Sequence, residues 1–436
     1  MKPPAEKPAV APDVLAFLLA CARLQPSASD IACMRAAFGN EQNWAALLSA
    51  LEWHGLVPLA ARRVSAAAFD VPASVRRALR ARRHAIAGIN LFLARELERV
   101  TDALGAERVN ALPFKGPSLA MAAFGDVSLR QFSDLDIIVA ERQLPAAIGV
   151  LEAAGYELKP GFRLTAAETR LYLRQGYHLP LRHRDHGTEL ELHWQVAGGA
   201  YRVFVSFEEL WERRTEVVLG SRPMPALCAE DHLLLLVINA AKEMWDRVSR
   251  VADCAGLLSR CSDFDWERTT KRARTMGAER MLLLGTHLAA THLAAPLPAQ
   301  IRRRCENDPG VANVSARLPR VWHEQISCDD ARATSHAFYG RCLDFSSQRF
   351  SYALLLLLQP SLNDVRAFRL PAAWYFLAWF LRPFRLLAQP LGPSRKTAQS
   401  GKVAKFSGTY ANPCTGTNAA AVDTGPPPTK VVSADP

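Results

Sequence analysis

Two short segments, 133–139 and 188–196, alternate polar and apolar residues in a chain whose other patterns are mostly helical. Side chains two positions apart in an extended strand point to the same side. Asp134 and Asp136 therefore share one face of the first segment, and the apolar residues between and after them share the other. A fold that contains this strand must hold two carboxylates together on one side of a sheet.

The second segment adds a third carboxylate. Glu189, Glu191 and His193 fall on one face of 188–196, with leucines and a tryptophan on the other. We favour Glu191 as the residue that acts with the aspartates and interpret Glu189 as a solvated strand residue. His193 is expected to be a hydrogen-bonded partner of the acidic cluster, with a role as base or ligand as the alternative.

These carboxylates predict a metal site. Two parallel carboxylates are costly to hold side by side unless a cation lies between them. Oxygen ligands of this kind suit Mg²⁺, which keeps waters and substrate phosphate oxygens in its other positions. With Glu191 as a third ligand, two metal ions would hold the attacking and leaving oxygens of a phosphoryl displacement.

A candidate phosphate site precedes the first acidic strand. The segment 114–118 reads Phe-Lys-Gly-Pro-Ser and leads into a predicted helix at 118–124. Glycine permits close backbone approach, and the N-terminus of a helix offers free N–H groups to a phosphate. Pro117 fits the first helical turn, where its missing N–H costs nothing.

The order of the predicted elements indicates an α+β fold: a small mixed-sheet core with helical regions on both sides. Strands are expected at 108–114, 133–139 and 188–196, and helices at 118–124 and 142–155. A long helix is expected from Asp231 through Asn239 to Trp245. We divide the chain into an N-terminal helical region at 1–100, an α/β core at 101–222, a C-terminal helical region at 223–388 and a disordered tail at 389–436.

Length and composition fit this division. The chain has 436 residues and a formal net charge of +11, which favours an anionic partner such as a nucleotide, a nucleic acid or a phospholipid surface. The sequence has no long basic arm with interleaved aromatic residues, so it does not require a nucleic acid as the anionic partner. The nine cysteines form no C-x-x-C pair, which argues against a zinc ribbon or a disulfide framework and favours a cytoplasmic protein.

Together these motifs resemble the DNA polymerase β-type nucleotidyltransferase superfamily and, within it, the bacterial uncharacterised nucleotidyltransferase family. The resemblance spans roughly residues 40–300 and rests on the order of the motifs. It is carried by Phe114-Lys115-Gly116, Arg130 four residues before Asp134-Leu135-Asp136, Glu191-Leu192-His193-Trp194, and a downstream group of Lys242, Trp245, Arg247 and Asp253.

The resemblance implies transfer of a nucleoside monophosphate from ATP or another NTP, with release of pyrophosphate and with Mg²⁺ or Mn²⁺ as cofactor. Asp134 and Asp136 would hold both metal ions, and Glu191 the catalytic one. Gly116 and Ser118 would cradle the β- and γ-phosphates. Further nucleotide contacts would come from Lys115, Arg130 and Lys242. The acceptor, which could be a protein, a small molecule, a sugar or RNA, and the oligomeric state are not specified.

The chain departs from the family pattern at Pro117, which separates the glycine from the serine, and at Glu191, where many relatives have aspartate. Several alternatives stay open. Lys115 could form a structural ion pair, and Arg130 could pair with Asp134. A catalytically idle nucleotide-binding or antitoxin-like regulatory module is the alternative to an enzyme.

The downstream aromatic residues also allow two interpretations. Trp245 and Arg247 could stack on the base, although a core role is favoured for the tryptophan, and Asp253 is expected to be an ion-pair partner. The segment 370–388 is either a helix that packs on the C-terminal region or a weak peripheral membrane contact, with Arg382 and Arg385 at the headgroups.

Overall fold

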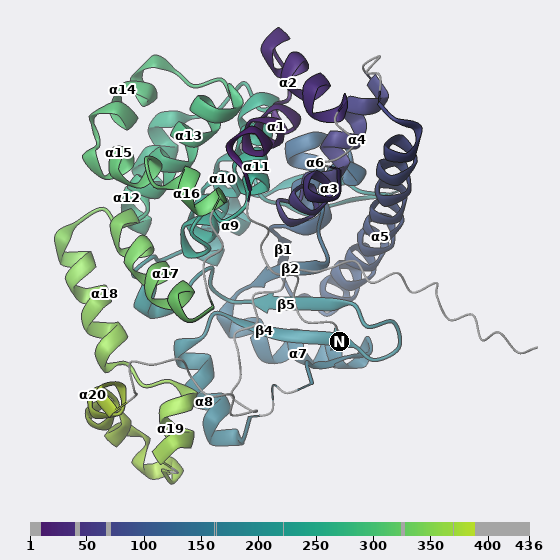
Figure 1. The fold of residues 1–436 in the computed structure, drawn as a ribbon. Helices are drawn as coiled ribbons and strands as arrows, with labels where there is room; N and C mark the ends of the chain where they lie inside the picture. Colours follow the sequence, from purple (N-terminus) through teal and green to yellow (C-terminus); the bar gives the residue numbers. More distant parts are fainter. Residues whose placement is uncertain are drawn as a thin grey trace, which may run out of the picture.

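The computed structural model describes residues 10–39, 44–66, 71–160, 162, 164–220, 222–323, 328–368 and 370–388. A five-stranded mixed sheet lies between an N-terminal group of helices and a larger C-terminal group (Figure 1). The predicted α+β class with helical flanks is confirmed. The predicted disordered tail at 389–436 lies outside the described residues.

The sheet has the strand order β1-β2-β5-β4-β3, with β2 and β5 parallel and the other neighbours antiparallel. Its strands are β1 (Ala111–Pro113), β2 (Asp134–Val139), β3 (Tyr156–Leu158), β4 (His178–His183) and β5 (Glu189–His193). The three predicted strands are present with shorter bounds. β3 and β4 were not predicted, because β3 has three residues and Pro180 argues against a strand at β4. A separate hairpin joins β6 (Thr215–Val218) to β7 (Pro223–Ala226).

Helices make up most of the remaining described chain. The N-terminal group is α1 (Pro12–Ala22), α2 (Ala28–Gly39), α3 (Trp44–Trp53), α4 (Val57–Ala66) and α5 (Ala73–Ala106). Around the sheet lie α6 (Gly116–Phe124), η2 (Val127–Leu129), η3 (Glu141–Gln143), α7 (Leu144–Ala153), α8 (Ala166–Gln175), η4 (Gly199–Tyr201) and α9 (Phe207–Glu212). The C-terminal group is α10 (Ala229–Lys242), α11 (Val248–Arg260), α12 (Trp266–Met276), α13 (Glu279–Leu293), α14 (Ala299–Asn307), α15 (Pro309–Ser315), α16 (Leu318–His323), α17 (Cys328–Cys342), α18 (Ser346–Leu358), α19 (Leu362–Phe368), η5 (Ala372–Leu377) and α20 (Ala378–Ala388). In the described part of the chain, no helix has both the length and the apolar character to cross a bilayer.

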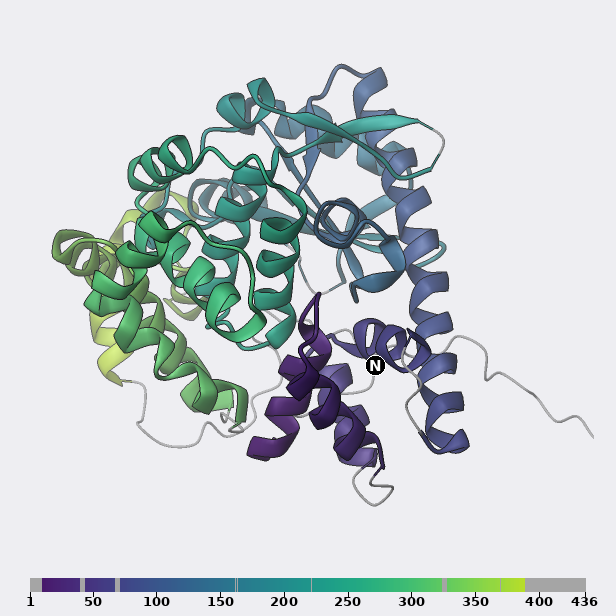
Figure 2. The same ribbon diagram turned by 90° about the horizontal axis from the view of Figure 1, so that it is seen from above.

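The two faces of the sheet have different surroundings. Leu135, Ile137 and Val139 of β2 pack with Leu190 and Leu192 of β5 in a buried core, which α5 and α7 complete. The long helix α5 runs along the edge of the molecule in both views (Figures 1 and 2). The polar positions of β2 and β5 therefore face the other way, towards α6 and the C-terminal helices.

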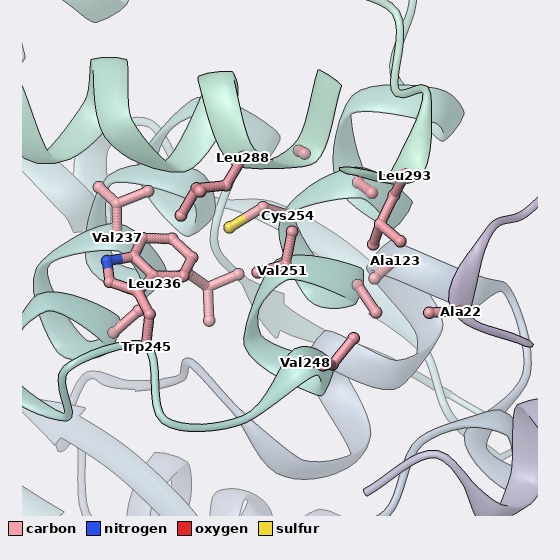
Figure 3. Close-up of a cluster of buried hydrophobic side chains, with 14 of the residues drawn as sticks. Ala22, Ala123, Leu236, Val237, Trp245, Val248, Val251, Cys254, Leu288 and Leu293 are labelled. Atoms are coloured by element: carbon pink, nitrogen blue, oxygen red, sulfur yellow. The ribbon is translucent and has the colours of Figure 1, made fainter. Parts of the chain in front are cut away.

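A second core joins those helices to the N-terminal group. Figure 3 shows Leu236 and Val237 of α10, Val251 and Cys254 of α11 and Leu288 of α13 converging in one apolar cluster, close to Ala123 of α6. Because α11 packs directly on α6, this core fixes the C-terminal helices against α6. Helices α6, α10 and α11 therefore lie beside the acidic face of the sheet.

The predicted helix from Asp231 to Trp245 ends earlier, at Lys242. Met244 and Trp245 have φ values of 55° and 52°, in the left-handed region that side chains other than glycine seldom adopt. Burial of the whole Trp245 side chain and a 2.7 Å hydrogen bond from Nε1 of Trp322 to its carbonyl oxygen stabilise this turn. Tertiary packing therefore overrides the helical pattern at these two residues, and Trp245 is a core residue.

The segment 370–388 forms η5 and α20, which pack on α18 and α19. Arg382 and Arg385 both pair with Asp364 of α19, whose side chain has no exposed surface. Of the two interpretations given for this segment, these contacts agree with the packing helix and not with arginines at lipid headgroups. A buried aspartate draws them inward, because a carboxylate without a partner is costly to bury.

Candidate functional site

The register between β2 and β5 places the predicted acidic residues in facing pairs. Asp134 lies opposite Glu189, and Asp136 lies opposite Glu191. Since neighbours in a parallel pair point to the same side of the sheet, all four carboxylates project from one face. The predicted grouping of acids on this face is what the fold produces.

Asp136, Glu191 and His193 form the most compact part of this group. Their nearest ligand atoms lie within 4.8 Å of one another. Nε2 of His193 is 3.2 Å from Oδ1 of Asp136 and 3.2 Å from Oε2 of Glu191, so the imidazole joins the two carboxylates. His193 is thus the hydrogen-bonded partner of the acidic cluster that the sequence predicts. The carboxylate oxygens that it contacts could also bind a cation.

Lys115 supplies the positive charge in this group. Its Nζ lies 2.8 Å from Oδ1 of Asp136. Although burial opposes ionisation, this ammonium and His193 hold the pKa of Asp136 below its usual range. Burial likewise disfavours the ammonium, but Asp136, Glu191 and Asp134 together raise the pKa of Lys115. Of the two roles left open for Lys115, the ion pair is present, and its partner is a candidate metal ligand.

Glu191 and Glu189 have different partners. Glu191 lies near His178 as well as His193, and these two groups hold its pKa below the usual range against the effect of burial. Glu189 instead pairs with Lys159, at 2.8 Å between Nζ and Oε1. Glu191 is therefore the carboxylate within the compact group, while Glu189 lies beside it in an ion pair of its own.

Asp134 carries the electrostatic strain of the site. Burial, followed by the charges of Asp136 and Glu191, raises its pKa to about 7. One ammonium, that of Lys115, does not offset several carboxylates gathered on one face of the sheet. A divalent cation would remove this cost, so the donor set fits a metal ion.

The first turn of α6 adjoins the acidic group. Gly116 has a φ of 55°, and a Cβ atom there would lie 3.3 Å from the carbonyl oxygen of Asp134. Pro117 occupies the first turn, where the backbone N–H groups of Gly116 and Ser118 have no acceptor within the helix. The Ser118 hydroxyl is buried without a hydrogen-bond partner among the described residues. The inserted proline is thus accommodated, and the turn keeps donors for an anion.

Two predicted nucleotide contacts have partners within the protein. Arg130 makes a two-pronged ion pair with Asp253 of α11, at 2.9 and 3.1 Å. The alternative pairing of Arg130 with Asp134 is not what the structure shows. Nζ of Lys242 donates to the carbonyl oxygen of Val196 at 2.7 Å and lies 4.0 Å from the ring centroid of Tyr177. Burial lowers the pKa of Lys242 to about 8.

Arg247 is a further cation whose charge acts on Asp134, although the sequence suggested for it only stacking on the base. Its guanidinium lies 5.0 Å from the Trp53 ring centroid, and its Nε is buried without a hydrogen-bond partner in the described chain. Burial lowers the pKa of Arg247, and Asp134 is among the acidic groups that oppose this effect. Nε1 of Trp53 and Oε1 of Gln131 are also buried and unpaired within the described ranges. Arg247 lies over the Trp53 ring and Nε2 of Gln131 donates to the carbonyl oxygen of the adjacent Glu52, so these unpaired atoms lie close enough together to serve one ligand.

No sequence motif marked this group, because its three residues come from separate elements. Trp53 ends α3, Gln131 precedes β2 and Arg247 precedes α11. Two backbone N–H groups that bond to His54 bring Trp53 and Arg247 together: that of Val248 donates to the side-chain Nδ1, and that of Ser249 to the carbonyl oxygen. The only sequence indication was the position of Arg247 in the downstream family motif.

A second acid and histidine group, Glu96, His183 and His186, lies at the start of β5. Its atoms are already used. His183 accepts from the N–H of Asp185 through Nδ1 and contacts the carbonyl oxygen of Ala154 through Nε2. Glu96 accepts from the hydroxyl of Tyr156 at 2.6 Å. This group is best explained as a structural network.

The chain matches a known protein family. The family described as "Uncharacterised nucleotidyltransferase" matches residues 40–294, which is more than half of the chain and includes the whole sheet and helices α3 to α13. Comparisons with curated proteins and with solved structures gave no match. The matched range agrees with the extent expected from the motifs. The chain therefore belongs to the uncharacterised nucleotidyltransferase family.

Proposed function

We propose that this protein transfers a nucleoside monophosphate from an NTP to an acceptor and releases pyrophosphate, with Mg²⁺ or Mn²⁺ as cofactor. The observation that carries the proposal is the facing pair of Asp136 and Glu191, joined by His193 and flanked by Asp134. Family membership supports nucleotidyl transfer in general. The identities of the metal, nucleotide and acceptor are part of the proposal.

Asp134, Asp136 and Glu191 would hold the metal ions. These oxygen donors are the type that Mg²⁺ prefers, and the raised pKa of Asp134 indicates an electrostatic cost that a cation would remove. When bound, such ions stabilise negative charge on the attacking and leaving oxygens. His193 would keep Asp136 and Glu191 in place, and Lys115 would neutralise Asp136 before the substrate arrives.

The phosphates would lie at the first turn of α6. Gly116 brings the backbone close to Asp134 without a side chain between them, and the Ser118 hydroxyl has no other partner in the described residues. The reaction breaks the bond between the α-phosphorus and the bridging oxygen and forms one to the acceptor. Pyrophosphate leaves, and the acceptor gives up a proton.

Arg247 would bind the polyphosphate of the nucleotide. Arg130 and Lys242 would have to leave Asp253 and Val196 to reach a nucleotide, whereas Arg247 would lose no hydrogen bond to a described residue. A guanidinium matches phosphate oxygens with two parallel hydrogen bonds. We therefore add Arg247 to Gly116, Ser118, Lys115, Arg130 and Lys242 as a nucleotide-binding residue.

The test is incubation with each α-labelled NTP and Mg²⁺, with cell protein, RNA and small-molecule fractions as acceptors. Wild type should transfer label and release pyrophosphate, and Asp134→Ala and Glu191→Gln should do neither while remaining folded. Equal transfer by wild type and both variants would show that the chemistry lies elsewhere.

An idle nucleotide-binding or regulatory module is the second candidate function. It would bind an NTP, measured by calorimetry, without releasing pyrophosphate under any condition. Wild type that binds no NTP would overturn both candidates.

A further inference from the structure

Helix α5 carries a basic row on its outward side. Its inward side is apolar and buried, with Leu79, Ile86 and Leu93 among the buried residues. The helix lies at the edge of the molecule in both views (Figures 1 and 2). Six residues spaced three or four positions apart line the outward side, and all six are exposed: Arg77, Arg80, His84, Gly88, Leu91 and Arg95. We call them the α5 basic row.

The charge of this row is not balanced within the described chain. Residues 73–95 contain six arginines and no acidic residue. Arg82 pairs with Glu52, whereas the side chains of Arg77, Arg80 and Arg95 make no ion pair or hydrogen bond with a described residue. Because like charges one helical turn apart repel each other, Arg77 and Arg80 do not stabilise the helix. They are better explained as groups that bind an anion.

Aromatic rings lie beside one end of the row. Phe92, which follows Leu91, is 46% exposed. Its ring meets that of the exposed His186 edge to face, with 5.2 Å between the centroids. His186 belongs to the turn between β4 and β5 and stacks on His183, with 3.5 Å between the centroids. Exposed rings beside arginines form the kind of surface on which nucleobases stack.

The shape of the row favours a single-stranded nucleic acid over other polyanions. At a rise of about 1.5 Å per residue, the distance from Arg77 to Arg95 is about 27 Å, which accommodates several nucleotides. A Cβ atom at Gly88 would meet no atom within 4 Å, so the middle of the row is open. A single strand exposes both its phosphates and the faces of its bases, whereas a duplex keeps those faces stacked inside. A bilayer-binding helix exposes a continuous apolar side, and the apolar side of α5 is buried in the core.

We propose that the α5 basic row, together with Phe92 and His186, binds a single-stranded nucleic acid. The arginines pair with its phosphates, and its bases stack on the two rings. This inference goes beyond the proposed transfer, because the row lies on the side of α5 away from the sheet. Asp134→Ala should therefore bind the strand as wild type does, and the two proposals can fail separately.

The test is a fluorescence-anisotropy titration of the full chain with a short mixed-sequence oligonucleotide, as single-stranded RNA, as single-stranded DNA and as a duplex. Wild type should bind single strands about tenfold tighter than the duplex or better, and added salt should weaken binding. Phosphates and base faces are common to RNA and DNA, so the tighter of the two single strands identifies the ligand.

The variant Arg77→Ala/Arg80→Ala/Arg95→Ala removes three phosphate contacts. It should weaken single-strand binding about tenfold or more at low salt and lower the slope of log affinity against log salt by about 2. The matched control changes three exposed arginines of α12 and α14 and alters the net charge equally: Arg268→Ala/Arg302→Ala/Arg303→Ala. It should bind as wild type does.

Phe92→Ala tests the stacking. It should weaken single-strand binding about tenfold, leave duplex binding unchanged and keep the melting temperature of wild type. Phe204→Ala, which removes an exposed ring elsewhere, is its control and should have no effect on binding. If Phe92→Ala binds the single strand as wild type does, the proposed preference for single strands is wrong.

Three further results would overturn the proposal. Wild type could bind no oligonucleotide, or the triple arginine variant could bind as tightly as wild type. Wild type could also bind polyglutamate, or vesicles that contain phosphatidylglycerol, as tightly as the single strand, which would make the row a general anion-binding or membrane-binding surface.

Discussion

Asp136 of β2 lies directly opposite Glu191 of β5, and one atom, Nε2 of His193, is 3.2 Å from a carboxylate oxygen of each. This relationship joins residues 55 positions apart in the chain into one donor set. Lys115 contacts the same Asp136 oxygen that His193 contacts. The charge on this one carboxylate is therefore balanced by groups from both the sheet and the segment before α6.

The first prediction concerns the choice between the two glutamates. Glu191→Gln should lower nucleotidyl transfer on the order of a thousandfold, because several kcal/mol of charge stabilisation depend on the metal ligands and each ~1.4 kcal/mol is tenfold in rate. Glu189→Gln, its matched control two positions away, should stay within about tenfold of wild type. Steady-state pyrophosphate release measures both. The reverse ranking would make Glu189 the third ligand.

The second prediction concerns Lys115. In Lys115→Met the buried carboxylate of Asp136 loses its ammonium partner, which costs about 3 kcal/mol of unfolding free energy when no metal is present. MgCl₂ should then raise the melting temperature of this variant more than that of wild type. Lys159→Met removes the ammonium from Glu189 instead and is the control. If both variants respond to MgCl₂ as wild type does, Asp136 does not bind the cation.

The third prediction concerns Arg247. Arg247→Gln should weaken binding of inorganic tripolyphosphate roughly tenfold to a hundredfold, the value of a charge-assisted hydrogen bond. Tripolyphosphate is the probe because it does not depend on the identity of the base. Calorimetry measures the affinity, and Arg250→Gln, which removes the partner of Asp246, is the comparison. An unchanged affinity in Arg247→Gln, with wild type binding normally, would leave this guanidinium without a phosphate role.

The fourth prediction concerns Gly116. In Gly116→Ala a residue with a Cβ atom must adopt a φ of 55°, and the Cβ would lie 3.3 Å from the Asp134 carbonyl oxygen. The variant should lose about 1 kcal/mol or more of stability and most of its activity. Gly149→Ala, on an open face of α7, should instead gain up to about 1 kcal/mol. Urea unfolding gives both values, and a Gly116→Ala variant as active as wild type would exclude close phosphate approach at this turn.

The fifth prediction concerns pH and His232 of α10, a buried residue whose Nε2 contacts the carbonyl oxygen of Phe114 at 2.7 Å. Burial lowers its pKa from 6.5 to about 4, so the unfolded chain binds more protons than the folded protein between these values. Stability should therefore rise with pH from about 4 to about 6.5 and be lost as the pH falls, by roughly 3 kcal/mol.

His232→Gln keeps a donor for Phe114 but removes this titration. Its unfolding free energy, measured against pH, should be flatter than that of wild type below pH 6.5. The exposed His84, replaced by glutamine, should leave the wild-type profile unchanged. Parallel profiles for wild type and His232→Gln would mean that folding does not lower the pKa of His232.

The sequence by itself determined the strands that carry the acids. Alternation at 133–139 and 188–196 assigned Asp134, Asp136, Glu191 and His193 to particular faces, because a strand has a fixed period of two. The glycine turn before α6 and the family also followed from local motifs. These features depend on neighbouring residues only, and so the amino-acid order is sufficient to predict them.

Tertiary structure decided which of these groups meet. Nothing in the sequence specified the parallel pairing of Asp136 with Glu191, the ion pair of Arg130 with Asp253, or the contact of Arg247 with the Trp53 ring. The sequence also did not specify the orientation of α20, because Asp364 and Leu356, which bind Arg382, lie on other helices. Such contacts follow from the packing of the whole chain, where burial and charge compensation between distant segments outweigh local pattern.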